Sequence, residues 1–227
     1  MESSLHRQLK QLYGGSPEDC EVTVAGYRID AVVKGRLVEV QRASLSAIRS
    51  KIGVLLDGHR VQLVKPIAAR TLIVRRRPGQ VEPARRYSPL RKNVFHLFDE
   101  LVHFGTVFPH PKLELEVILI EQEERRIPRR RSRFNGPDFR VEDRLLLSVL
   151  SRHTFKTAAD LAALLPSGLP SPFQTQHLAE AASIPRWLAQ KMTYCLARCG
   201  AIELAGKAGR CMLYVVPKKM ARRRQAA

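Results

Sequence analysis

The segment Arg28–Gln41 gives the clearest indication of the fold, and it reads RIDAVVKGRLVEVQ. Apolar and polar residues alternate on both sides of Lys34-Gly35, which is typical of two antiparallel strands joined by a short turn. A two-residue turn there places Asp30 opposite Glu39. A symmetric four-residue loop keeps this register, whereas a three-residue loop shifts it. The segment therefore predicts a β-hairpin with two facing carboxylates.

The alternation also divides the hairpin into two faces. One face is wholly apolar and is expected to lie on the core; it carries Ile29, Ala31, Val33, Val38 and Val40. The other face carries Arg28, Asp30, Val32, Leu37, Glu39 and Gln41. Directly opposed carboxylates have Cβ atoms about 5 Å apart and repel each other, and a divalent cation such as Mg²⁺ would offset that repulsion. The alternative is a solvated face on which Arg28 neutralises one carboxylate.

The flanking sequence extends the hairpin to an α/β domain. A helix is predicted over residues 3–13, a three-stranded meander over 20–41, and a second helix over 44–56 with Ser44 as its N-cap. Further along, strands are expected at 61–64, 72–74 and 113–120, a loop at 75–89, and an amphipathic helix at 92–104.

The pattern Asp30-x8-Glu39-x-Gln41, with a helix before and after it, resembles the PD-(D/E)XK nuclease superfamily over roughly residues 1–75. That superfamily includes many restriction endonucleases and Holliday-junction resolvases. The resemblance implies a restriction-endonuclease-like α/β fold that hydrolyses phosphodiester bonds. It also implies that Asp30 and Glu39 bind Mg²⁺ or Mn²⁺, and that Gln41 positions the attacking water.

Gln41 departs from the pattern of the superfamily, which usually has lysine there. An amide orients water by hydrogen bonds but supplies no positive charge. Arg49 or Lys51 on the following helix could supply that charge; otherwise they are ordinary polar-face residues. Glu2 lies where members of the superfamily often carry a helix-borne acid, or else belongs to a frayed terminus.

The net charge gives an independent indication of function. The chain holds 39 Lys and Arg against 21 Asp and Glu, for a formal net charge of +18. Such a basic surface attracts polyanions, of which nucleic acid is the commonest. A ribosome-type structural role, an anionic membrane surface, and basicity without a dedicated partner are the alternatives. The arginines of a basic linker at 125–140, notably Arg129, Arg130 and Arg131, are expected to contact phosphate; a solvated spacer is the alternative.

Three features bear on the compartment. No run of about 18 apolar residues occurs, so no membrane span is expected. The start of the chain lacks the basic region and apolar stretch of a secretory signal. The cysteines form no C-x-x-C pair and are expected to be free thiols in a reducing compartment; they are Cys20, Cys195, Cys199 and Cys211. These features predict a cytoplasmic protein, associated with the nucleoid if it binds DNA.

Beyond the linker, helices are expected at 141–150, 158–165, 175–182 and 185–199, followed by a β-hairpin around 206–209. This order resembles a winged helix-turn-helix over residues 141–217. The last helix has an expected buried stripe of Leu188, Met192, Cys195, Leu196 and Cys199. Its other side and the hairpin tip carry basic residues expected to contact nucleic acid, interleaved with Trp187 and Tyr194: Arg186, Lys191, Arg198, Lys207 and Arg210. The alternative is a protein interface, including that of a homodimer.

The sequence thus predicts a nuclease-like domain (1–124), a basic linker (125–140), a winged helix-turn-helix domain (141–217) and a basic tail (218–227). The predicted function is a DNA-binding, divalent-metal-dependent nuclease targeted by the winged helix. The alternative is a non-catalytic DNA-binding regulatory or scaffold protein that retains the nuclease-like fold.

Overall fold

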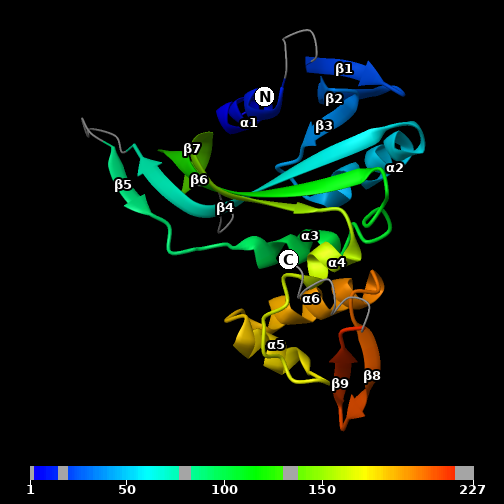
Figure 1. Ribbon diagram of the computed structural model, residues 1–227. Helices are drawn as coiled ribbons and strands as arrows, with labels where there is room; N and C mark the ends of the chain where they lie inside the picture. The colour runs from blue at the N-terminus through cyan, green and yellow to red at the C-terminus, as the bar shows by residue number, and fades with distance from the viewer. Residues whose placement is uncertain (1–2, 15–19, 77–82, 130–137, 218–227) are drawn as a thin grey trace. The chain divides into compact units, whose positions relative to one another are not determined.

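A computed structural model of the chain describes residues 3–14, 20–76, 83–129 and 138–217, and it shows a mixed α/β protein (Figure 1). The helices are α1 (Ser4–Tyr13), α2 (Arg49–Gly58), α3 (Leu97–Leu101), α4 (Ala158–Ala162), α5 (Thr175–Ala181) and α6 (Arg186–Arg198). Short 3-10 turns, η2 (Leu45–Ile48) and η3 (Val94–His96), precede α2 and α3.

Among the residues that the structure describes, seven strands form one mixed sheet. They are β1 (Cys20–Val24), β2 (Tyr27–Val33), β3 (Arg36–Val40), β4 (Arg60–Arg75), β5 (Ala84–Tyr87), β6 (Leu113–Pro128) and β7 (Phe139–Phe155). The strand order is β1-β2-β3-β4-β6-β7, and β5 pairs with β4 beside this path. A separate two-stranded sheet consists of β8 (Glu203–Ala208) and β9 (Cys211–Val215).

The N-terminal meander has the register that the sequence predicts. β2 and β3 are antiparallel, with the pairs Ala31↔Val38, Val32↔Leu37 and Val33↔Arg36. Lys34 and Gly35 adopt φ angles of 51° and 72°, as in a type I′ turn, whose twist suits the flanking strands. Glycine adopts this left-handed conformation without steric cost. The expected two-residue turn is therefore confirmed.

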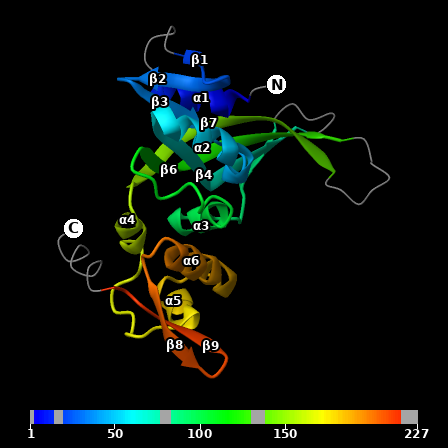
Figure 2. The same cartoon turned by 90° about the vertical axis from the view of Figure 1, so that its right-hand side faces the viewer.

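Helix α1 covers one face of the meander (Figures 1 and 2). Leu5 and Leu9, one turn apart on α1, are buried in an apolar cluster with residues of four strands: Ala31, Val38, Val40, Val64, Ile118 and Ile120. Ser3 caps the helix by accepting a hydrogen bond from the His6 N–H. The expected core face of the hairpin is thus the face beneath α1.

The other predicted elements of this region are present with shifted bounds. The helix expected at 44–56 is η2 followed by α2, and Ser44 caps it through the Ser46 N–H. The β-rich segments 61–64 and 72–74 belong to the single strand β4. Residues 84–87, expected in a loop, form β5 because they pair with Leu72–Arg75.

One predicted helix is wrong. Residues 141–150 lie in β7, a neighbour of β6 in the sheet. The apolar residues of this segment fit a helical period as well as a strand, and Leu146 and Val149 pack against the α1 cluster from β7. The expected linker is corrected with it: 125–128 extend β6 and 139–140 begin β7, while 130–137 lie outside the described residues.

The described chain divides into two units whose segments alternate along the sequence. Unit 1 comprises Met1–Arg42, Val64–Val94 and Val117–His153, and unit 2 comprises Ala43–Leu63, Phe95–Glu116 and Thr154–Ala227. The predicted boundary at residue 124 falls inside β6. Each unit therefore draws on several separate stretches of the sequence.

In the C-terminal part of unit 2, helices α4, α5 and α6 are followed by the β8–β9 hairpin, as expected. The predicted stripe on α6 is buried at Leu188, Met192, Cys195 and Leu196, and Cys199 is half-buried. The winged-helix domain predicted over 141–217 is not evident within these residues, all of which are described, because its first helix is part of β7. The tail at 218–227 lies outside the described residues.

None of the described helices combines the length and the apolar composition that crossing a lipid bilayer requires.

Candidate functional site

Asp30 lies on β2 and is held by groups on two sides. Its Oδ2 accepts a hydrogen bond of 2.8 Å from the backbone N–H of Val40, and its Oδ1 is 3.4 Å from Nε2 of His6 on α1. Burial acts to raise the pKa of the Asp30 carboxyl, but the hydrogen bonds from His6 and Val40 outweigh it, so this pKa lies below its ordinary value. The carboxylate therefore has a structural task, which is to satisfy a backbone donor.

The surroundings of Asp30 are cationic. It lines a cavity of about 440 Å³ in unit 1, together with Ser3, His6, Lys10, Glu21, Arg28 and Arg42. Glu21 bonds Lys10 Nζ at 2.8 Å and also Arg28, and the bonds from Lys10 and Arg28 lower the pKa of Glu21 to about 2. Arg28 thus neutralises Glu21, whereas the sequence suggested that it neutralises a carboxylate of the hairpin.

Glu39 points to the side of the sheet that faces away from α1. Its neighbours Val38 and Val40 both pack beneath α1, and successive side chains of a strand point to opposite faces. Glu39 is 7% exposed and is not among the residues that line the cavity of Asp30. The turn and the residue pairs next to it are as expected, and a cation shared by Asp30 and Glu39 stays a prediction. Among the described residues, no three His, Cys, Asp or Glu side chains form a group suited to a metal ion.

A buried lysine accompanies Glu39 and Gln41 on their face. Gln41 donates its backbone N–H to the Val64 carbonyl at 2.9 Å. Lys65 follows Val64, which packs beneath α1, so Lys65 points to the opposite face, where it is 4% exposed and donates to the Arg42 carbonyl at 3.3 Å. Sequence reasoning missed Lys65, whose one signal in the sequence is that it is a charged residue inside an apolar run.

Arg49 and Lys51, suggested as the source of the positive charge that Gln41 lacks, lie in unit 2. Arg49 is exposed and bonds the His103 carbonyl at 3.5 Å, and Lys51 is half-buried. Glu2 lies outside the described residues.

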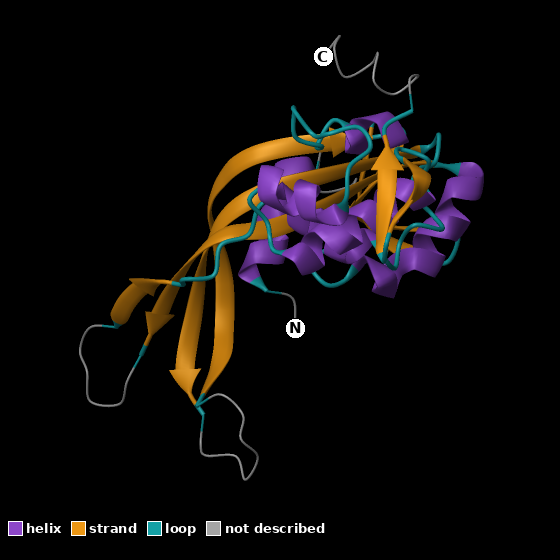
Figure 3. Cartoon of the chain, turned by 90° about the horizontal axis from the view of Figure 1, so that it is seen from below, coloured by secondary structure: helices purple, strands orange, loops and turns teal. Residues whose placement is uncertain are grey.

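Unit 1 also carries two arginine-rich strand pairs, which Figure 3 shows as separate ribbons. The β4–β5 arm consists of residues 70–76 and 83–91, and the β6–β7 arm of residues 121–129 and 138–144. Exposed arginines of the first arm are Arg70, Arg76, Arg85, Arg86 and Arg91; those of the second are Arg125, Arg129 and Arg140. The sequence signal was present at Arg129, but Arg130 and Arg131 lie outside the described residues.

Several arginines of the arms are fixed by acidic and aromatic neighbours. The Arg126 guanidinium lies 3.9 Å from the Phe139 ring centroid and bonds Glu124 at 2.7 Å. Arg125 bonds Glu123 at 2.7 Å. Such contacts orient a guanidinium while leaving other N–H groups available to an anion.

Tyr87 is the corresponding anchor on the β4–β5 arm. Arg70 and Arg91 lie 4.9 and 5.6 Å from its ring centroid. Its hydroxyl bonds Glu121 at 2.6 Å, and this hydrogen bond raises the pKa of Tyr87.

The two arms meet along one groove. Arg75 bonds Asp138 at 2.5 Å, and the Arg76 N–H donates to the Arg126 carbonyl at 3.1 Å. The groove has a volume of about 140 Å³ and takes its lining from both arms: Val74, Arg76, Pro83 and Arg85 from the first, and Glu123, Arg125, Arg126 and Glu142 from the second. Four arginines therefore face one narrow space.

The basic residues predicted on α6 and the β8–β9 hairpin have different environments. Arg186, Lys207 and Arg210 are exposed. Lys191 is engaged within unit 2, since its Nζ lies 2.5 Å from Asp99 and 5.1 Å from the Trp187 ring centroid. Arg198 donates to the Tyr194 hydroxyl at 2.8 Å. Lys191 is thus the member of this set whose charge is already balanced.

Fold and site together define a mixed α/β protein with an arginine-lined groove on a seven-stranded sheet. The chain belongs to the family described as Domain of unknown function (DUF8091), which matches residues 3–156. It is similar to an uncharacterized protein of Treponema pallidum (strain Nichols), with 32% identity over 182 residues that cover 79% of this chain and 72% of that protein. No solved structure shows a significant match.

Proposed function

We propose that this protein binds nucleic acid, most favourably DNA, and that its two arms hold the phosphate backbone. The observation that carries the proposal is the groove to which both arms contribute arginines, among them Arg76 and Arg125. Guanidinium groups bind phosphate oxygens through paired N–H donors, and a two-stranded ribbon has the width of the DNA major groove. The net charge of +18 supports the same partner.

The acidic residues that bond Arg125 and Arg126 are compatible with this role. Glu123 bonds Arg125 and Glu124 bonds Arg126, each at 2.7 Å. Both carboxylates are at most 9% exposed, so they lie behind the arginines that they orient. A phosphate approaching from solvent therefore meets the guanidinium groups of Arg125 and Arg126 before these two carboxylates.

Binding of labelled duplex DNA to the full chain, measured by fluorescence anisotropy, tests the proposal. Each phosphate contact contributes about 0.9 log unit of affinity at 0.1 M salt, so Arg76→Gln with Arg85→Gln should weaken binding by about 60-fold. The control is Arg7→Gln with Arg60→Gln, which removes the same charge from exposed positions outside the arms. Equal losses for the two variants would reduce the effect to overall charge and overturn the assignment to the arms.

A divalent-metal-dependent nuclease of the PD-(D/E)XK type is the competing proposal. It is supported by the element order α1-β1-β2-β3-α2-β4 and by the unbroken sequence β1-β2-β3-β4 within the sheet. The bonds that hold Asp30 to His6 and Val40, and the absence of Glu39 from the lining of the cavity around Asp30, weigh against it. For that reason we favour a non-catalytic protein on a restriction-endonuclease-like core.

Cleavage assays separate the two proposals. Circular, linear and branched DNA are incubated with the protein and Mg²⁺ or Mn²⁺, with a chelator as control. Cleavage that Glu39→Gln abolishes while binding persists would establish the nuclease. Binding without cleavage is the result that we expect.

A further inference from the structure

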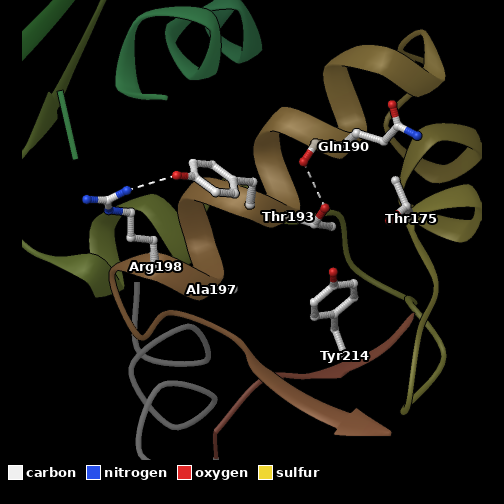
Figure 4. Close-up of a pocket in the computed structure, with 7 residues that line it drawn as sticks. Thr175, Gln190, Thr193, Ala197, Arg198 and Tyr214 are labelled. Carbon is white, nitrogen blue, oxygen red and sulfur yellow. Dashed lines mark hydrogen bonds between the residues drawn. The ribbon is translucent and has the colours of Figure 1, made fainter. Parts of the chain in front are cut away.

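Unit 2 contains a cavity of about 500 Å³ formed by α5, α6 and β9 (Figure 4). Its volume is in the range of pockets that take small organic ligands. Its lining combines two aromatic rings, one arginine and three polar side chains: Tyr194, Tyr214, Arg198, Thr175, Gln190 and Thr193. This composition differs from that of the groove between the arms, which contains no aromatic ring.

One wall of the cavity is a fixed aromatic ring. Tyr214 pairs with Phe173 through two backbone hydrogen bonds, Phe173 N–H to Tyr214 at 2.9 Å and Tyr214 N–H to Phe173 at 2.8 Å. The two rings are 6.0 Å apart and tilted by 38°, and Phe173 is 2% exposed. A half-buried ring held in this way can stack on a flat ligand with little loss of conformational freedom.

Polar groups converge on the same space. Figure 4 shows Gln190, Thr175 and Tyr214 around the cavity. The Thr193 hydroxyl is used within α6, where it donates to the Gln190 carbonyl at 3.0 Å. Gln190 is exposed, and no described residue hydrogen-bonds its side-chain amide. That amide offers a donor and an acceptor side by side, which is the complement of the edge of a nucleobase.

A cation stands at the end of the cavity. Arg198 donates one N–H to the Tyr194 hydroxyl at 2.8 Å, which fixes the guanidinium beside the pocket and leaves its other N–H groups for a second acceptor. Tyr194 is 46% exposed. The stacking ring suits the face of a base, the amide suits its edge, and the arginine suits the phosphate of the same nucleotide.

We propose that this cavity binds a single nucleotide unit, with the base on Tyr214, the base edge at Gln190 and the phosphate at Arg198. The inference rests on the proposed function, because it gives a nucleic-acid-binding protein a second site, which reads an unpaired base. The nucleotide could be an unpaired position of a single strand or a free nucleoside monophosphate, since both present the same chemistry.

Affinity of the full chain for labelled single-stranded dA and dT oligonucleotides tests the inference. Loss of base stacking lowers affinity by about fivefold to 150-fold, and we expect a decrease in this range for Tyr214→Leu. Tyr214→Phe keeps the ring and should retain most of the affinity. Gln190→Ala, at an exposed helix position, should lower affinity and reduce the difference between dA and dT. Its matched control is Gln176→Ala, an exposed glutamine of α5 that does not line the cavity.

Competition with free dAMP and dTMP distinguishes the two sources of the nucleotide. Displacement that depends on Gln190 supports the pocket with a free nucleotide as occupant, and tighter binding of the oligonucleotide supports an unpaired base. Unchanged single-strand affinity in both Tyr214→Leu and Gln190→Ala would overturn the inference. If the arm variant still weakens duplex binding in that case, the proposed function stands and the pocket assignment alone has failed.

Discussion

Replacing Asp30 with alanine removes the carboxylate that accepts the Val40 N–H at 2.8 Å. Val40 is 1% exposed, so water cannot readily replace the lost acceptor. Leaving a buried donor unsatisfied costs about 1–3 kcal/mol, and we expect the free energy of unfolding to fall by about that amount. The substitution Asp30→Asn keeps an oxygen acceptor but removes the charge, so it should cost about 1 kcal/mol.

The sign of this change distinguishes a structural Asp30 from a metal ligand. Two carboxylates arranged to share a cation repel each other when no cation is bound. Removing one of them would then raise the free energy of unfolding in a metal-free buffer. In the structure, the Asp30 carboxylate is bonded by His6 and Val40, so we expect its removal to lose these bonds and to lower the free energy of unfolding.

Urea unfolding at pH 7 with a chelator present provides the assay. Asp57→Ala is the matched control, because Asp57 is an exposed aspartate whose only described bond uses its backbone carbonyl. We expect a change within about 0.5 kcal/mol for the control. A more stable Asp30→Ala protein would refute the structural role and favour the shared cation.

The same variants give a pH dependence. Burial acts to raise the pKa of Asp30, but the hydrogen bonds from His6 and Val40 lower this pKa by a larger amount. The pKa of Asp30 in the folded protein therefore lies below its unfolded value. Such a group contributes stability above the unfolded pKa, and this contribution is lost as pH falls through the folded pKa. The difference in stability between wild type and Asp30→Asn should therefore stay constant above about pH 5 and shrink as the pH falls from about 5 through the folded pKa. A difference that stays constant over this range would contradict the lowered pKa.

Two further predictions concern the fold. Gly35 has a φ of 72°, so Gly35→Ala should lower the free energy of unfolding by about 1–2 kcal/mol. Gly53→Ala is the control, because Gly53 lies within α2 and a Cβ added there meets open space; equal losses of stability for the two variants in thermal unfolding would count against the type I′ turn. Burial, with a smaller contribution from Cys199, raises the pKa of the Cys195 thiol to about 12. Mass spectrometry after iodoacetamide treatment at pH 8 should therefore find Cys211 alkylated well before Cys195. Alkylation in the reverse order would contradict the buried stripe of α6.

The local rules of the sequence were sufficient for the meander. Lys34-Gly35 predicts a tight turn, and a two-residue turn there gives the register that the structure has. The stripe on α6 was equally readable, because Leu188, Met192 and Leu196 are spaced for one helix face and are fully buried. In both cases the signal lies within a few residues of chain.

The predictions from the sequence failed where contacts between distant segments of the chain decide the local structure. Residues 141–150 pair with β6 and so become a strand despite a pattern that also suits a helix. The surroundings of Asp30 depend on its bond to Val40 and on the position of α1, neither of which a strand pattern contains. The groove is likewise invisible in the sequence, since Arg85 and Arg125 meet only through the sheet.

The dependence of DNA affinity on salt tests the central proposal most directly. The slope of log K against log salt is about −0.9 for each phosphate neutralised. If Arg76 and Arg85 each hold one phosphate, replacing both with glutamine should make the slope shallower by about 1.8, while Arg7→Gln with Arg60→Gln should leave it unchanged. A wild-type slope in the arm variant would show that the arms do not hold the backbone.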